Sequence, residues 1–225
     1  MSPPRRWRSW ALPLTDTNSQ PARVLVVFYS RDGSTEALAK AIGEGAAGEG
    51  AEVRIRRVRE LVGAEVMAMA PGWAENAARM NDLYPAPTAE DADWAEAIVL
   101  GSPTRFGGAA SELRAWLETL GGLWFAKKLM NKVGSVFTSV SSAHGGLETT
   151  VLGLYPAMAH LDMVIVPQGY GHPAAMNAGS PYGVGSISAG SQRLMPTDDD
   201  LGLARYQGQR VARIARTTRP LRDNA

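Results

Sequence analysis

Short apolar runs recur at regular intervals along this chain. Five of them, rich in β-branched or aromatic residues, are typical of buried strands and cover residues 23–29, 52–58, 97–101, 132–138 and 163–166. The run over 52–58 alternates apolar and charged residues, which favours a place nearer the sheet edge. The other runs are more continuously apolar, as expected of strands covered on both faces.

Helical patterns lie between and after these runs. One helix is expected from about residue 34, another around the stripe Leu113, Trp116, Leu117 and Leu120, and a third over about 147–160. The last is expected over 197–217, where Thr197 and three aspartates suit a helix N-terminus. Because each crossover must cover a sheet face, we expect an α/β fold with a doubly wound, five-stranded parallel sheet.

The remaining stretches define the domain limits. Residues 59–92 carry Pro and Gly breakers and little periodicity, and 168–195 are interpreted as an insertion rich in Gly, Ser and Pro. Residues 1–21 are interpreted as a disordered N-terminal extension, because the apolar stretch after Arg8 is too short for an export signal. We expect one domain over 22–218 and a C-terminal tail over 219–225.

Composition narrows the function classes. The 225 residues are 45% hydrophobic and 20% charged with a formal net charge of +1, which favours neither nucleic acid nor a basic redox partner. No cysteine is present, so disulfides, thiolate chemistry and iron–sulfur clusters are excluded. Three scattered histidines give no metal-ligand spacing, and no apolar run reaches the roughly 18 residues of a membrane span. We expect a cytoplasmic protein without a metal.

The loop after the first strand carries the first chemical signal. It reads Ser30-Arg31-Asp32-Gly33-Ser34-Thr35 and joins a buried strand directly to a helix. Backbone N–H groups at a helix N-terminus lack helical partners and attract anions, and hydroxyl groups add further donors. No lysine follows, as it does in nucleoside triphosphate loops, so a single phosphate fits better. The alternative is an ordinary Ser/Thr helix cap.

A literal G-x-G-x-x-G occurs at Gly43, Gly45 and Gly48. A dinucleotide fingerprint follows a strand and opens a helix, whereas these glycines come late in the first helix. We therefore expect them to serve helix packing and termination.

Two further polar, glycine-containing loops follow the next buried strands. Residues 101–108 read Gly-Ser-Pro-Thr-Arg-Phe-Gly-Gly, and residues 139–146 read Ser-Val-Ser-Ser-Ala-His-Gly-Gly. In a parallel sheet, ligands bind beyond the carboxyl ends of the strands. Three such loops at one sheet end predict a site for a phosphate and a flat polar ring.

The motifs over 101–107, 121–124 and 134–139 resemble the WrbA family of NAD(P)H:quinone oxidoreductases, as do Gly179-Ser180-Pro181-Tyr182-Gly183 and Ala204-Arg205-Tyr206-Gln207-Gly208. The resemblance covers about 22–217. It implies a flavodoxin-like fold with strand order 2-1-3-4-5, an insertion in the last strand, FMN as cofactor and a homotetramer.

The resemblance also implies roles for single residues. Residues 30–35 match the FMN phosphate loop, and Pro103, Thr104, Arg105 and Phe106 match the flavin-ring loop. The third FMN loop is matched by Ser139, Val140, Ser141, Ser142, His144, Gly145 and Gly146. His160 matches a histidine beside the flavin, with helix capping as its alternative. Trp124 matches an aromatic residue on the substrate side near a subunit interface, with a purely structural anchor as its alternative.

Two positions depart from the family pattern. Asp32 stands where members often carry an aromatic residue that faces the nicotinamide or substrate, and an aspartate cannot stack. The third loop is one residue longer than usual. The position of Arg105 leaves open whether it binds flavin carbonyls, binds a nicotinamide phosphate or lies on the surface.

The leading hypothesis is FMN-dependent two-electron reduction of a small-molecule quinone by NADH or NADPH. A flavodoxin-type electron carrier is the first alternative, although such carriers usually have strongly acidic surfaces. A non-catalytic regulatory protein is the second alternative, and no basic or repetitive segment supports it.

Overall fold

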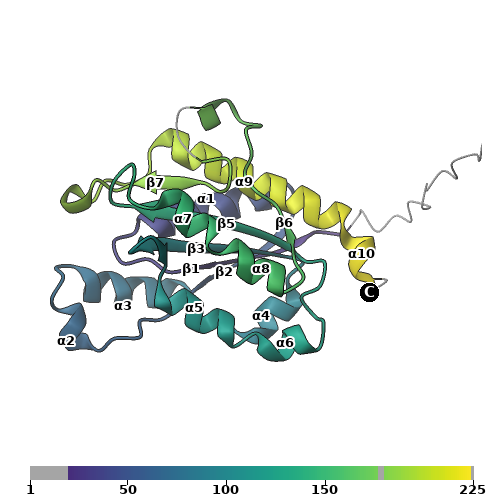
Figure 1. Cartoon of the computed structure of the whole chain (residues 1–225), viewed down its shortest axis with the longest axis horizontal. Coiled ribbons are helices and arrows are strands. Elements are labelled where there is room, and N and C mark those ends of the chain that lie inside the picture. Colours follow the sequence, from purple (N-terminus) through teal and green to yellow (C-terminus); the bar gives the residue numbers. More distant parts are fainter. Residues whose placement is uncertain (1–19, 177–179, 224–225) are drawn as a thin grey trace, which may run out of the picture.

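A computed structural model describes residues 20–176 and 180–223. Its sheet contains β1 (Arg23–Phe28), β2 (Glu52–Arg57), β3 (Ala97–Arg105), β5 (Val133–Val140) and β6 (Val164–Ile165). These strands are parallel and lie in the order β2-β1-β3-β5-β6 (Figure 1). With the short β4 (Gly108–Ala109) set aside, this is the predicted order 2-1-3-4-5, which is confirmed.

The last strand is split in two. β6 pairs with Val133 and Gly134 at the amino end of β5, and β7 (Gly185–Ile187) pairs with Thr138, Ser139 and Val140 at its carboxyl end. The intervening residues include the 3₁₀ helix η2 (Pro173–Met176), and η3 (Gly190–Gln192) follows β7. The predicted insertion in the last strand is therefore present, but it ends where β7 begins instead of running on to residue 195.

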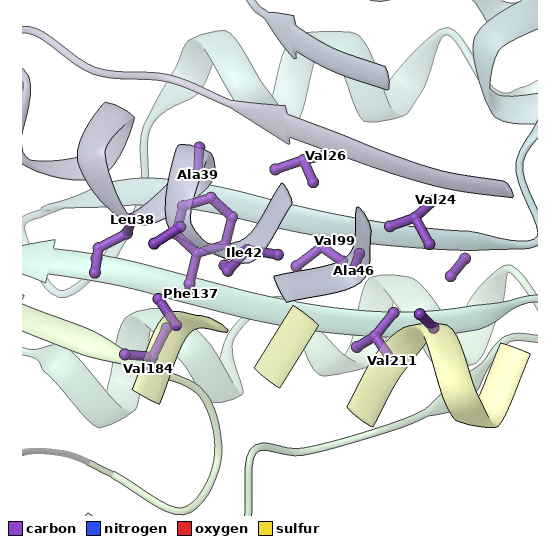
Figure 2. Packing of buried hydrophobic residues seen from close by; sticks show 14 of the residues in the cluster. Val24, Val26, Leu38, Ala39, Ile42, Ala46, Val99, Phe137, Val184 and Val211 are labelled. Carbon is purple, nitrogen blue, oxygen red and sulfur yellow. The ribbon is translucent and has the colours of Figure 1, made fainter. Parts of the chain in front are cut away.

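Two helical layers cover the sheet. α1 (Ser34–Gly48) and α9 (Asp198–Thr217) lie on one face. The other face carries α4 (Ala89–Trp94), α5 (Ser111–Glu118), α7 (Leu147–Leu152) and α8 (Tyr155–His160) (Figure 1). Alternate residues of β1 pack into the two layers: Val24, Val26 and Phe28 join the α1–α9 cluster, and Leu25 and Val27 join the other, as does Tyr29 directly after the strand. Figure 2 shows the first cluster, in which Val211 approaches from α9 and Ile42 from α1.

Glycines allow α1 and α9 to touch through their backbones. A Cβ atom on Gly208 would lie 2.0 Å from the Ile42 carbonyl oxygen, and one on Gly45 would lie 2.0 Å from the Arg205 carbonyl oxygen. Gly43 lies against β2, where a Cβ atom would stand 2.9 Å from the Ile55 side chain. α1 ends at Gly48. The glycines of the G-x-G-x-x-G match therefore serve packing and termination, as predicted.

Several elements differ from the sequence-based expectation. Residues 59–92 contain α2 (Ala64–Met67), α3 (Trp73–Leu83) and α4, which starts with a capping box between Thr88 and Asp91. The helix expected over 147–160 is two helices, because Pro156 in the first turn of α8 lacks the N–H that a continuous helix would need. β3 continues to Arg105, four residues beyond its predicted end. α6 (Gly121–Phe125) adds a short helix after α5.

The chain ends are described in part. Residues 219–223, expected as a tail, form α10 (Arg219–Asp223), and Arg219 and Arg222 pair with the buried carboxylate of Glu96. The N-terminal extension predicted over 1–21 lies outside the described residues up to position 19. None of the helices within 20–176 and 180–223 is long and apolar enough to span a bilayer.

Candidate functional site

A cavity of about 50 Å³ opens at the carboxyl ends of β1, β3 and β5. All three predicted loops contribute to it, together with one residue beyond β7. The lining residues are Ser30, Arg31, Asp32, Ser34, Thr35, Pro103, Thr104, Arg105, Ser139, Val140, Ser141 and Ser188. The loops that the sequence analysis grouped therefore do meet at one end of the sheet.

The first loop presents an open helix N-terminus. Gly33 is the N-cap of α1 with φ 97°, and among the described residues no side chain caps this end. The Ser30 hydroxyl instead accepts the N–H of Gly33 at 3.1 Å, which folds the loop back before the helix starts. The first backbone N–H groups of α1 are thus left for a ligand, and an anion suits them best. An ordinary Ser/Thr cap does not describe this loop.

Hydroxyl pairs tie the first loop to the neighbouring strands. Ser34 and Ser186 are hydrogen-bonded with their oxygens 2.9 Å apart, and Thr35 and Ser139 with theirs 2.8 Å apart. All four side chains are buried. Each hydroxyl keeps capacity for a further hydrogen bond, because it is both donor and acceptor. The pairs orient polar atoms of α1, β5 and β7 beside the same cavity.

The second loop is a hairpin between β3 and β4. Thr104 pairs with Ala109 and Arg105 with Gly108, so Phe106 and Gly107 form a two-residue turn. Both have positive φ, 51° and 79°, as type I′ hairpin turns require. The Phe106 ring at the tip is fully exposed. The turn therefore offers a free aromatic face beside the cavity.

The third loop packs against this hairpin. Thr104 Oγ1 donates to the Gly146 carbonyl at 3.4 Å, and a Cβ atom on Gly146 would lie 3.0 Å from the Cα atom of Gly107. Gly145 donates its N–H to the Ser142 carbonyl at 2.9 Å. Ser141, Ser142 and His144 are exposed, and His144 does not line the cavity.

Charged side chains surround the mouth of the cavity. Arg31 lies 3.7 Å from the ring centre of Trp73 and donates to the Tyr29 hydroxyl at 3.3 Å. Burial raises the pKa of that hydroxyl to about 12, so it stays protonated. Asp32 pairs with Arg193 at 4.0 Å. Burial, and then the charge of Arg31, lower the pKa of Arg105.

Two predicted site residues, Trp124 and His160, do not line the cavity of their own chain. Trp124 is half exposed on α6, and His160 is exposed at the end of α8 (Figure 1). Asn131, just before β5, donates its N–H to the carbonyl of Asp162, two residues after His160. His160 thus lies toward the amino ends of the strands, away from the three loops. One copy of the chain does not bring Trp124 or His160 to the cavity.

Sequence reasoning missed the contribution of the chain beyond the insertion. Ser186 bonds to Ser34 of the first loop, Ser188 lines the cavity, and Arg193 faces Asp32. The serine alternation at 186 and 188 is the only local signal, and it is too short to predict a strand. Within the described part of the chain, no group of three or more histidine or acidic side chains could hold a metal ion.

Known proteins similar to this chain point to the same region of the molecule. A family model described as NADPH-dependent FMN reductase matches residues 23–175, which include all three loops. The chain belongs to the NADPH-dependent FMN reductase family. A Sinorhizobium fredii protein named NAD(P)H dehydrogenase (quinone) is 43% identical over 199 residues, covering 86% of this chain and 97% of that protein. A Deinococcus radiodurans protein of the same name is 41% identical over 195 residues, covering 86% of this chain and 96% of that protein.

Solved structures agree on the fold of this family member. The WrbA-like flavodoxin from Agrobacterium tumefaciens aligns with a TM-score of 0.62 at 24% identity, over 87% of this chain and 98% of that chain. A flavodoxin from the domain Archaea aligns with a TM-score of 0.56 at 19% identity, over 86% of this chain and 98% of that chain. At these identities the likeness shows the fold alone. The family resemblance and the flavodoxin-like fold predicted from the motifs are both confirmed.

Proposed function

We propose that this protein holds FMN in the cavity and catalyses the two-electron reduction of quinones by NADH or NADPH. The proposal draws on family membership and on relatives of nearly the same length that are named NAD(P)H dehydrogenase (quinone). The observation that carries it is the open N-terminus of α1 at the head of a cavity formed by three polar loops.

The phosphate of FMN fits the loop over 30–35. The backbone N–H groups of Ser34, Thr35 and Glu36 begin α1 without a side-chain cap among the described residues. The hydroxyls of Ser34 and Thr35 supply further donors beside them. This arrangement of neutral donors and helix dipole suits a phosphate monoester.

The flavin ring fits between the second and third loops. The hairpin carrying Thr104 and Phe106 packs on Gly146, and it has no side chains at Gly107 in the turn or at Gly108 in β4. Backbone N–H groups there can meet the polar edge of the ring, and the exposed Phe106 offers a face for a second aromatic group. Arg31 and Arg105 make the mouth electropositive and favour anionic donors or acceptors.

Bound FMN supplies hydride and electron transfer, chemistry that no side chain can perform. The chain contributes by holding the ring, by excluding water from its covered side and by offering an open mouth for nicotinamide and quinone in turn. Arg105, close to Arg31, stabilises negative charge that develops near the second loop.

A second copy of the chain completes the substrate side. Trp124 and the strongly exposed Phe125 form an aromatic surface on α6, and His160 is exposed on α8. Tryptophan and phenylalanine are enriched at protein interfaces. We infer a homotetramer in which Trp124 and His160 of one subunit approach the cavity of another. Its mass in solution tests this, and Trp124→Ser with Phe125→Ser is expected to give smaller species with a raised quinone KM.

The decisive experiment is steady-state reduction of a small benzoquinone by NADH and by NADPH, with FMN-reconstituted protein and FMN-free protein as the control. We expect quinone-dependent oxidation of at least one nicotinamide only when FMN is bound. In anaerobic mixing, bleaching of the flavin absorbance should precede addition of quinone. A flavin that stays oxidised with both nicotinamides contradicts the proposal.

A further inference from the structure

Arg57 is a fully buried cation behind the first loop. It is the last residue of β2, and its relative exposure is 0%. In the sequence it follows Arg54 and Arg56, which are partly exposed and pair with Asp91 at the sheet edge. Of these three arginines on β2, Arg57 is therefore the one whose charge is fully buried.

The guanidinium of Arg57 touches the loop proposed for the phosphate. Its Nη2 donates to the Ser30 carbonyl oxygen at 3.0 Å, and its Nη1 donates to Asn81 Oδ1 at 2.6 Å. The peptide group that contains the Ser30 carbonyl ends in the N–H of Arg31. A cation on the carbonyl polarises that peptide, which strengthens the N–H as a donor.

The counterion of Arg57 is Glu60. Both of its oxygens accept from the guanidinium, and Trp73 Nε1 donates to Oε1 at 3.3 Å. Burial alone raises the pKa of Glu60, but the hydrogen bond and charge of Arg57 outweigh it and lower the pKa. The carboxylate is therefore ionised. Trp73 also stacks on Arg31, so one connected network supports the first two residues of the loop.

Stability alone does not account for this network. Burying an ion pair gains little over well-packed apolar side chains of the same volume. In addition, Arg57 Nε is buried without a hydrogen-bond partner in the described structure, which costs free energy. Packing and stability therefore do not explain why a cation is buried at this place.

We propose that Arg57 is a positioning residue for the FMN phosphate, holding the Ser30–Arg31 peptide and placing positive charge beneath the phosphate loop. The inference rests on the proposed binding of FMN at this loop. On this inference, Arg57 contributes to the affinity for the phosphate group and not to the affinity for the flavin ring. Riboflavin, which lacks the phosphate, is therefore the matched probe.

The test compares the Kd of FMN and of riboflavin for FMN-free protein, followed by quenching of flavin fluorescence. Arg57→Gln removes the charge and leaves Glu60 unpaired. We expect its FMN affinity to fall about tenfold or more, the value of a hydrogen bond to a charged group, while riboflavin affinity is unchanged. Arg57→Lys keeps the cation and should recover most of the loss. Arg54→Gln is the control, because Arg54 lies on the same strand but pairs with Asp91 at the sheet edge and shares no partner with Arg57.

Glu60→Gln gives a second, opposite expectation and remains informative if Arg57→Gln does not fold. It leaves the charge of Arg57 uncompensated, so FMN should bind more tightly relative to riboflavin than in the parent protein. Equal changes in both affinities for Arg57→Gln, or an unchanged FMN-to-riboflavin ratio for Glu60→Gln, overturn the inference. Failure of the parent protein to bind FMN better than riboflavin would instead refute phosphate binding at the loop.

Discussion

The backbone of Arg205 in α9 lies so close to Gly45 in α1 that a Cβ atom on Gly45 would stand 2.0 Å from the Arg205 carbonyl oxygen. α1 begins directly after the loop over 30–33, and α9 packs along its length. This close backbone contact therefore fixes the position of α1, whose N-terminus lies at the cavity.

Gly45→Ala tests this packing. Because neither backbone can yield without moving a helix, we expect the free energy of unfolding to fall by about 2 kcal/mol or more, as overpacking does in rigid cores. Gly48→Ala is the matched control, since no atom lies within 4 Å of its added Cβ. It should be neutral or slightly stabilising, because alanine favours a helix over glycine. Urea unfolding of both variants measures the difference, and equal effects contradict the backbone contact.

The hydroxyl pair between Thr35 and Ser139 is expected to serve the phosphate. Thr35→Val keeps the shape and removes the hydroxyl, so FMN affinity should fall about tenfold with little change for riboflavin. Thr35→Ser should retain most of the affinity. Thr119→Val, at the far end of α5, serves as the control. If Thr35→Val weakens riboflavin as much as FMN, the hydroxyl faces the ring and not the phosphate.

The Gln207 side chain links α9 to β5 and to Val184, the residue directly before β7. Its amide donates to the Ser135 hydroxyl at 2.8 Å and to the Val136 carbonyl at 2.7 Å, and its Oε1 accepts the N–H of Val184 at 2.8 Å. Gln207→Leu leaves these buried groups unpaired and should cost about 2–3 kcal/mol of stability. FMN affinity should also fall, because β7 carries Ser186. Thermal melts and FMN titration measure both, with the half-buried Gln209→Leu as the control. An unchanged FMN affinity would show that β7 does not depend on this side chain.

The carboxylate of Glu96 should make stability depend on acid pH. Burial alone raises its pKa, but hydrogen bonds from Arg219, the Arg23 N–H and Arg222 outweigh it and lower the pKa from 4.5 to about 2. A depressed folded-state pKa adds stability that is complete above pH 4.5 and is lost as the pH falls toward 2. Glu96→Gln should therefore cost about 3 kcal/mol near neutral pH and progressively less in acid.

Urea unfolding of the parent and of Glu96→Gln across this pH range provides the measurement. Glu118→Gln, at an exposed position on α5, should show no such convergence. A difference for Glu96→Gln that is constant from pH 7 to the acid limit would mean that the ion pairs with α10 contribute nothing to stability.

The local pattern of apolar residues was sufficient to predict the central strands. After Arg23 the residues of β1 are apolar at successive positions because the strand is covered on both faces, and their β-branched and aromatic character favours a strand over a helix. The loops that follow could be predicted as a group, since the carboxyl ends of parallel strands share one edge. The polar character of residues 30–35 then indicated a phosphate.

Local pattern failed where an element depends on distant partners. α3 buries only Trp73, Ala77 and Met80. Its other contacts include Asn81 with Arg57 and Arg79 with Glu36, which no window of neighbouring residues contains. The same holds for Trp124 and His160, whose predicted roles require a second subunit.

The sequence by itself thus determined the parallel α/β architecture, the family and the three loops of the site, because each is encoded in contiguous residues. Only the tertiary structure decided that β7 brings Ser186 to Ser34, 152 positions earlier in the chain, and that Arg57 is fully buried while Arg56 stays partly exposed. Both outcomes depend on contacts between segments that are far apart in the sequence. The residues next to Ser186 or Arg57 in the chain therefore do not predict them.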